Sequence, residues 1–105
     1  MDPFIVVEHN KKKFKTPIKE NGGMQPVWNH SFIITQTSLD DVIKIICYDE
    51  DFIMDDFVGE TTVLFSSIIK GPGHEQWLPI YYKIQKSGEV LVEANVLSDD
   101  SKASK

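Results

Sequence analysis

The sequence predicts an all-β protein, folded as an antiparallel β-sandwich of about seven short strands. Its 105 residues are enough for one small domain with one hydrophobic core. Short stretches rich in β-branched and aromatic residues recur along the chain, with turn-forming residues between them at fairly regular spacing. No long amphipathic helical pattern interrupts them. This combination is typical of a sandwich.

Three strands are predicted in the first third of the chain. Residues 3–10 are rich in β-branched and aromatic side chains, which fit a pleated sheet. Residues 11–19 follow a tight lysine-rich turn, and Pro17 marks them as an edge strand or an irregular one. Residues 29–35 alternate apolar and polar side chains and predict a third strand.

The middle of the chain carries the clearest strand pattern. Within residues 42–48, Ile43, Ile45 and Cys47 share one face, while a lysine marks the other face as partly wet. Residues 57–64 predict the strand that follows.

The last third is predicted as a helical turn followed by two strands. Residues 65–70 form the turn, and residues 77–82 form a short strand interrupted by Pro79. A turn is expected at Ser87-Gly88, and residues 89–96 alternate cleanly. The domain therefore covers residues 1–97, and the small, charged residues 98–105 are expected to be a disordered tail.

Charge and cysteine usage restrict the class of protein. The formal net charge is −5, and an acidic chain is a poor candidate for nucleic-acid binding. One cysteine, Cys47, cannot form an internal disulfide, and its place on an apolar strand face favours an inert core thiol. The sequence shows neither a signal-peptide pattern nor a run of about 20 apolar residues. We therefore expect a cytoplasmic protein.

The loop between the two central strands has two features that cost free energy. Five carboxylates lie between Asp49 and Asp56, and like charges at short range repel one another. The apolar residues Phe52, Ile53 and Met54 stand in the middle of this polar loop, where water contact gains them nothing. A divalent cation held by the carboxylates, with a membrane receiving the apolar tip, would account for both features.

Several ordered stretches carry a resemblance to a known family. Asp2-Pro3-Phe4-Ile5-Val6 resembles the Asp-Pro-Tyr-Val segment of the C2 domain, the calcium-dependent lipid-binding β-sandwich. The other matching stretches are residues 25–30, similar to the family's Asn-Pro-x-Trp-Asn-Glu segment; residues 48–60, similar to its third calcium loop; and residues 88–92, similar to its closing strand. The family has eight strands, and this chain resembles a C2 domain that lacks its N-terminal strand.

The resemblance implies a calcium site. It assigns the carboxylates of Asp2, Asp49, Asp51 and Asp56 and the carbonyl of Glu50 as ligands, with Asp55 as a further candidate. Calcium takes about six to eight oxygen ligands in loose geometry. One ion is expected rather than two or three, because the Asp of the absent first loop is missing. The alternative is a loop of solvated carboxylates; an EF-hand is excluded, because the third ligand and the required Gly are absent.

The apolar tip and the lysines are candidate lipid contacts. Phe52, Ile53 and Met54 either insert into a bilayer or fold back onto the core, and Met24 in the neighbouring loop would add to the insertion. The set Lys11, Lys13 and Lys15 shares one face if its segment is extended. Some C2 domains bind phosphoinositides with lysines on these strands. The alternative is that the lysines of this hairpin are simply solvated.

The preferred function is a Ca²⁺-dependent phospholipid-binding module that docks peripherally on anionic membranes, of a kind used in signalling and membrane trafficking. The alternative is an interaction domain with an incomplete calcium site, which binds a protein partner or a lipid without calcium. An enzyme is not favoured, since the sequence offers no nucleophile–base pair, phosphate-binding Gly-rich loop or transition-metal cluster.

Overall fold

The computed structural model describes residues 2–19, 26–35 and 38–97. Within these ranges the chain forms six strands and one short helix. They are β1 (Pro3–His9), β2 (Lys12–Lys15), β3 (Val42–Asp49), β4 (Asp56–Leu64), α1 (Phe65–Ile68), β5 (Gln76–Tyr82) and β6 (Gln85–Val92). No helix in the described part of the chain is long and apolar enough to cross a bilayer.

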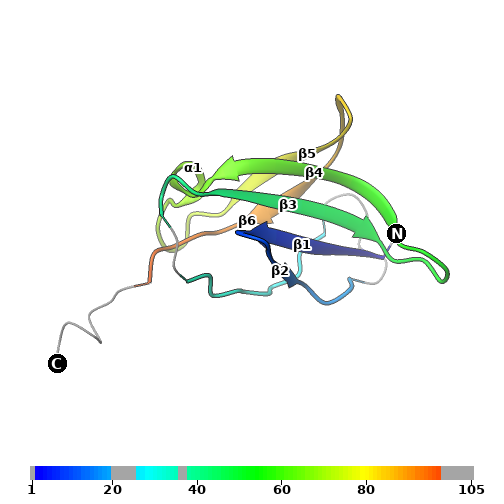
Figure 1. Cartoon of the computed structure of the whole chain (residues 1–105), viewed down its shortest axis with the longest axis horizontal. Coiled ribbons are helices and arrows are strands. Elements are labelled where there is room, and N and C mark those ends of the chain that lie inside the picture. The colour runs from blue at the N-terminus through cyan, green and yellow to red at the C-terminus, as the bar shows by residue number, and fades with distance from the viewer. Residues whose placement is uncertain (1, 20–25, 36–37, 98–105) are drawn as a thin grey trace.

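The strands follow one another antiparallel in the order β2-β1-β3-β4-β5-β6. β3 lies at the centre of the first layer and pairs along its length with β1 and β4. β4 and β5 meet at one registered pair, Glu60 with Tyr81, so the sheet turns at this point. The β5–β6 hairpin then crosses behind the first layer (Figure 1).

Both layers contribute to one hydrophobic core. Ile5 and Ile45 from the first layer are buried in the same cluster as Ile80 and Val90 from the β5–β6 hairpin. Phe65 and Ile68 of α1 join this cluster. Since two sheets that share a core form a sandwich, the predicted C2-type β-sandwich is confirmed.

The central strand folds as its alternation predicts. Ile43, Ile45 and Cys47 are buried in the core, while the outward Lys44 lies 3.4 Å from the Glu60 carboxylate on β4. The predicted helical turn after β4 is also present as α1.

The first third of the chain has less regular pairing than predicted. β2 ends at Lys15 because Thr16 takes over the contact with β1: the Ile5 N–H donates to its hydroxyl, and its own N–H donates to the Ile5 carbonyl, both at 2.9 Å. The strand predicted over residues 29–35 is wrong. Phe32 and Ile34 are half-buried and Ile33 is exposed, so the alternation is real, yet no described strand pairs with this segment.

The last hairpin also differs from its prediction. β5 runs unbroken through Pro79, and Ser87 and Gly88 lie inside β6, so the turn predicted at those residues is wrong. The register pairs Tyr82 with Gln85 and thus places the turn at Lys83 and Ile84. The predicted tail lies outside the described residues.

Candidate functional site

The acidic loop is the tip of a β-hairpin at one end of the sandwich. β3 ends at Asp49, β4 begins at Asp56, and these two residues pair directly. Residues 50–55 therefore project beyond the sheet (Figure 1). β1 starts at the same end, with Pro3 opposite Asp49.

Three sequence motifs meet at the base of this loop. The Asp2 N–H donates to Oδ1 of Asp49 at 2.8 Å, and the Glu50 N–H donates to the Asp2 carbonyl at 2.9 Å. Nε1 of Trp28 donates to the Pro3 carbonyl at 3.2 Å. The Asp2 and Trp28 motifs therefore lie at the same end of the sandwich as the acidic loop.

The loop carboxylates partly serve the loop's own backbone. Oδ1 of Asp51 accepts from the Phe52 N–H at 2.5 Å, and Oδ1 of Asp55 accepts from the Asp51 N–H at 3.4 Å. The donor set consists of oxygens, which suits Ca²⁺. Among the described residues, however, no three His, Cys, Asp or Glu side chains are grouped so that they could hold a metal ion. The loop thus has the oxygen ligands that calcium prefers, but its carboxylates are not gathered around one point where an ion could sit.

The apolar tip is in water. Phe52, Ile53 and Met54 are 102%, 91% and 72% exposed. The alternative in which they fold back onto the core is therefore wrong. Three adjacent exposed apolar residues on a protruding loop form a candidate interaction surface.

A row of four aromatic rings crosses the outer face beneath the loop. Ring centroids are 5.4 Å apart between Phe4 and Tyr48, 6.2 Å between Tyr48 and Phe57, and 5.8 Å between Phe57 and Tyr82. The row connects β1, β3, β4 and β5, so it ties the base of the acidic loop to the β5–β6 hairpin. Sequence reasoning missed it, because the four residues are brought together by strand register.

A lysine caps each end of this aromatic row. Nζ of Lys15 lies 4.5 Å from the Phe4 ring centroid, and Nζ of Lys83 lies 5.6 Å from the Tyr82 ring centroid. An open groove runs beside the exposed end of the row, where Phe57 and Tyr82 line it together with Lys86.

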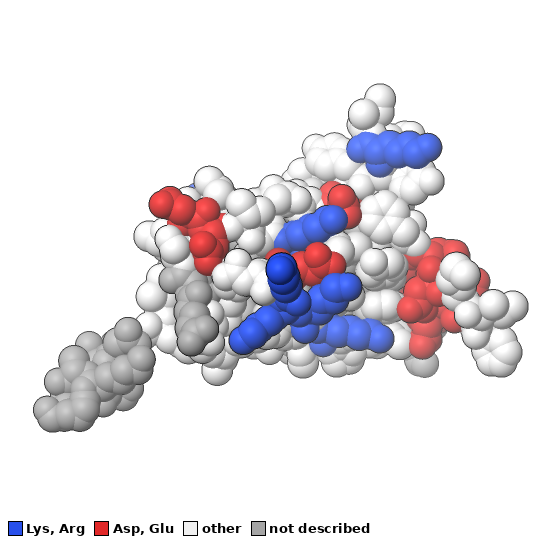
Figure 2. Space-filling model, viewed as in Figure 1, with Lys and Arg blue, Asp and Glu red and all other residues white. Residues whose placement is uncertain are grey.

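The lysines of the first hairpin are placed differently from one another. Lys13 and Lys15 share a face of β2, whereas Lys11 lies in the turn with φ 69° and does not continue that face. Nζ of Lys13 is 3.7 Å from the Glu8 carboxylate. Figure 2 shows lysines gathered over β1 and β2, with carboxylates among them and at the acidic loop. Met24 lies outside the described residues.

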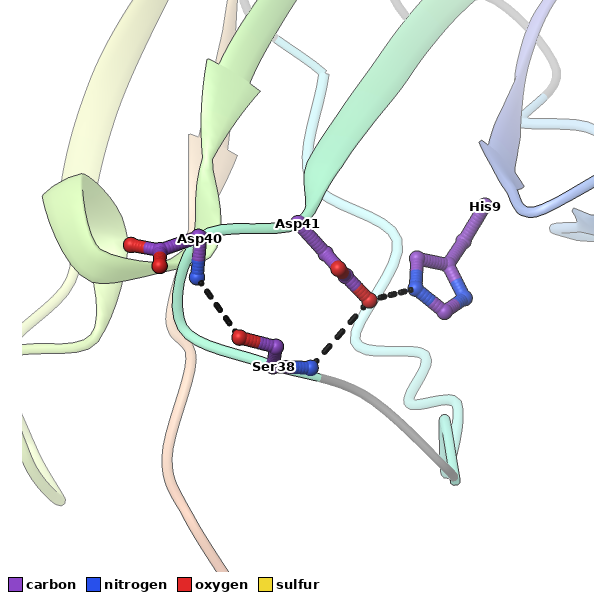
Figure 3. Close-up of polar contacts among 4 residues, drawn as sticks. All are labelled: His9, Ser38, Asp40 and Asp41. Carbon is purple, nitrogen blue, oxygen red and sulfur yellow. Dashed lines mark hydrogen bonds and ion pairs between the residues drawn. The ribbon is translucent and has the colours of Figure 1, made fainter.

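A second polar cluster stabilises the opposite end of the sandwich. The buried His9 places Nε2 2.8 Å from Oδ2 of Asp41, and the Ser38 N–H donates to the same oxygen at 3.1 Å (Figure 3). The hydrogen bond with His9, followed by that from Ser38, lowers the pKa of Asp41. Asp41 immediately precedes β3, so this cluster ties the loop before β3 to the end of β1.

Cys47 is an inert core thiol, as predicted. Its side chain is buried, and burial followed by the nearby charge of Asp49 raises its pKa to about 11. A thiol that stays protonated at neutral pH is a poor nucleophile.

Comparison with known proteins matches the C2 domain family over residues 1–80. The chain belongs to the C2 domain family. The C2 domain is a non-catalytic module, and C2 domains commonly bind Ca²⁺ and phospholipids.

Individual relatives are 26–32% identical to this C2 domain over the aligned residues. The mouse 1-phosphatidylinositol 4,5-bisphosphate phosphodiesterase eta-1 is 32% identical over 70% of this chain and 5% of its own length. The rice Elicitor-responsive protein 3 (Oryza sativa subsp. japonica) is 31% identical over 65% of this chain and 48% of its own length. The mouse eta-2 phosphodiesterase is 26% identical over 91% of this chain and 6% of its own length. The chain thus spans about half of the rice protein and a small part of the phosphodiesterases.

Proposed function

We propose that this C2 domain binds anionic phospholipid membranes in a Ca²⁺-dependent manner, from the cytoplasmic side, through the loop between β3 and β4. The observation that carries the proposal is the combination found on this one loop: carboxylates at its base and arms, and three fully or largely exposed apolar side chains at its tip. The exposed apolar tip does not stabilise the folded chain, and both features have a use at a membrane.

Calcium is proposed to bind at the base of the loop. The carboxylates of Asp49, Asp51 and Asp56 would hold it, with Asp2 and the Glu50 carbonyl completing the set and Asp55 as a further ligand. Asp51 and Asp55 are exposed, so turning their carboxylates from the loop backbone toward an ion exchanges weak solvated hydrogen bonds for ion contacts. The bound ion would supply positive charge, which cancels the repulsion between the loop and an anionic surface.

The tip residues Phe52, Ile53 and Met54 are proposed to enter the boundary between headgroups and acyl chains. Full burial of each side chain is worth about 1.5–3 kcal/mol, so three of them support reversible docking. Met24, in the preceding segment, is proposed to join them.

The lysine-bearing hairpin is proposed as an auxiliary headgroup site. Lys13 and Lys15 share a face and would contact an anionic headgroup together, and Lys11 would have to approach it from the preceding turn. The mouse relatives are named for phosphatidylinositol 4,5-bisphosphate, a lipid with this kind of headgroup. An exposed ion pair such as Lys13–Glu8 contributes little and does not prevent such a contact.

Co-sedimentation with phosphatidylserine-containing vesicles, with Ca²⁺ and with chelator, tests the proposal. The protein should pellet with Ca²⁺, and the double substitution Asp49→Asn, Asp51→Asn should abolish the calcium response. Asp40→Asn is the matched control, because Asp40 is an exposed carboxylate before the opposite end of β3. Folded wild-type protein that pellets equally in chelator, or not at all, would reject calcium-dependent docking.

The second candidate is a calcium-independent interaction domain that binds a protein partner or a lipid. It is favoured by the finding that no three potential metal ligands are grouped among the described residues. Calorimetric titration and thermal denaturation at millimolar Ca²⁺ separate the two candidates, because an ion that binds the folded state raises its melting temperature. No heat and no thermal shift would support this second candidate.

A further inference from the structure

The turn between β5 and β6 carries an exposed apolar residue that the fold does not require. Lys83 and Ile84 form the two-residue turn, and Ile84 is 98% exposed. The adjacent Tyr82 is 49% exposed and packs its ring against Phe57.

Both turn residues are poor choices for stability. Lys83 has φ 58°, a left-handed conformation that two-residue hairpin turns usually assign to Gly or Asn. An Ile side chain in water contributes nothing to the core and adds a risk of aggregation. The tip of this hairpin therefore has two locally unfavourable features, the left-handed backbone of Lys83 and the exposed side chain of Ile84. Unfavourable features of this kind are common at functional sites.

The strand directions place this tip toward the same end of the sandwich as the acidic loop. β4 starts at the acidic loop and runs away from it, and β5 returns antiparallel to β4, so β5 ends at the same end of the sandwich. The contact between Phe57 at the start of β4 and Tyr82 at the end of β5 joins the bases of the two hairpins. Figure 1 shows the β3–β4 loop projecting beyond the end of the sheet, at the right, and the β5–β6 hairpin projecting away from the sheet in a different direction, at the top of the view.

The two tips carry opposite charge. Residues 82–88 contain Lys83 and Lys86 and no acidic residue, whereas residues 49–56 contain five carboxylates and no basic residue. Lys86 forms an exposed ion pair with Glu89 at 3.0 Å, which is weak enough to be exchanged for a phosphate. Figure 2 shows lysine on the hairpin and carboxylates on the loop. A basic tip with an apolar and an aromatic side chain fits the interface of an anionic bilayer.

We propose that the β5–β6 hairpin tip, Tyr82 to Lys86, is a second membrane contact: Ile84 enters the acyl boundary, Tyr82 lies at headgroup depth, and Lys83 and Lys86 bind anionic headgroups. The inference rests on the proposed function, because both tips meet the same bilayer. It assigns lipid binding to a hairpin separate from the carboxylate-bearing loop.

Site-specific labelling can separate the two tips. The variants Met54→Cys, Ile84→Cys and Val96→Cys each receive one environment-sensitive fluorophore at neutral pH, while Cys47 stays unlabelled because it is buried and its pKa is about 11. Val96 is the matched control, since it is an exposed apolar residue beyond the far end of β6. The probes are phosphatidylcholine vesicles with and without phosphatidylserine, in Ca²⁺ and in chelator.

The expected result is a blue-shifted, brighter label at positions 54 and 84, and no change at 96, on phosphatidylserine vesicles with Ca²⁺. Ile84→Ser should weaken vesicle affinity about tenfold or more, while Val96→Ser leaves it unchanged. A response at 54 without one at 84 overturns the second contact and leaves the proposed function intact. A response at 84 without one at 54 supports the β5–β6 contact and contradicts docking through the β3–β4 loop. No response at either position overturns both proposals.

Discussion

The two hairpin tips toward one end of the sandwich differ in the charge that surrounds their apolar side chains. The β3–β4 tip presents Phe52, Ile53 and Met54 between carboxylates, and the β5–β6 tip presents Ile84 between lysines. If both tips meet an anionic bilayer as proposed, the first would be repelled until a cation neutralises it, whereas the second would be attracted by its lysines. Calcium would then control the larger contact.

The tips also differ in how their backbones are held. Within residues 50–55, the exposed carboxylates of Asp51 and Asp55 accept hydrogen bonds from backbone N–H groups, so ion binding can remodel this loop. The β5–β6 tip has two residues closed directly by the Tyr82–Gln85 pair. The long loop therefore suits a switch, and the short turn suits a fixed contact.

The largest expected difference between the tips is in binding energy. Replacing Phe52, Ile53 and Met54 together by Ser should weaken calcium-dependent vesicle binding by about 4–6 kcal/mol, more than a hundredfold, whereas Ile84→Ser should cost about tenfold. Vesicle titration by co-sedimentation measures both. Equal losses from the two substitutions would contradict a division into a major and a minor contact.

Gly59 tests whether the tips depend on the close approach of β4 and the β5–β6 hairpin. A Cβ at this position would lie 2.2 Å from Oγ of Ser87 and 3.1 Å from the Tyr81 carbonyl oxygen. Gly59→Ala should therefore reduce the free energy of unfolding by about 1–3 kcal/mol, measured by urea denaturation. Adding Ser87→Gly should recover part of the loss, and a Gly59→Ala variant as stable as wild type would argue against the tight approach.

Neutralising Lys83 should reveal the electrostatic part of the smaller contact. Lys83→Gln is expected to weaken binding to phosphatidylserine vesicles by about 1 kcal/mol, roughly fivefold, with an effect that shrinks at high salt. Binding to vesicles of pure phosphatidylcholine serves as the control, because it lacks the anionic headgroup. A loss independent of salt would indicate that Lys83 acts through the turn conformation.

The smallest effect is expected at the far end, where Asp41 should affect stability and leave both tips unchanged. Its pKa is lowered in the folded state, so its contribution is present above the unfolded pKa of about 3.9 and is lost as pH falls through the lower folded value. Asp41→Asn should lower the melting temperature at pH 7, and the difference from wild type should shrink below about pH 4. Thermal denaturation across this range, beside vesicle binding at pH 7, checks both statements.

The sequence by itself determined the β-sandwich, most of its strands and the acidic loop with its apolar tip. These features depend on local properties: alternation along Val42–Asp49 reports which side chains are buried, and clustered carboxylates beside Phe52 have no use in a core. The family resemblance added the Asp2 and Trp28 motifs, and the hydrogen bonds of Asp2 and Trp28 place them at the base of this loop.

The tertiary structure decided what depends on a partner strand. Residues 29–35 alternate like a strand and yet pair with none of the described strands, because alternation reports burial and a strand also needs an edge to bond. The last turn lies at Lys83-Ile84 and not at Ser87-Gly88, since the register of β5 with β6 overrides local turn preference. The pairing of β4 with β5 brings Tyr82 to Phe57, from a distant position in the sequence, and directs the β5–β6 turn toward the end of the sandwich that carries the acidic loop.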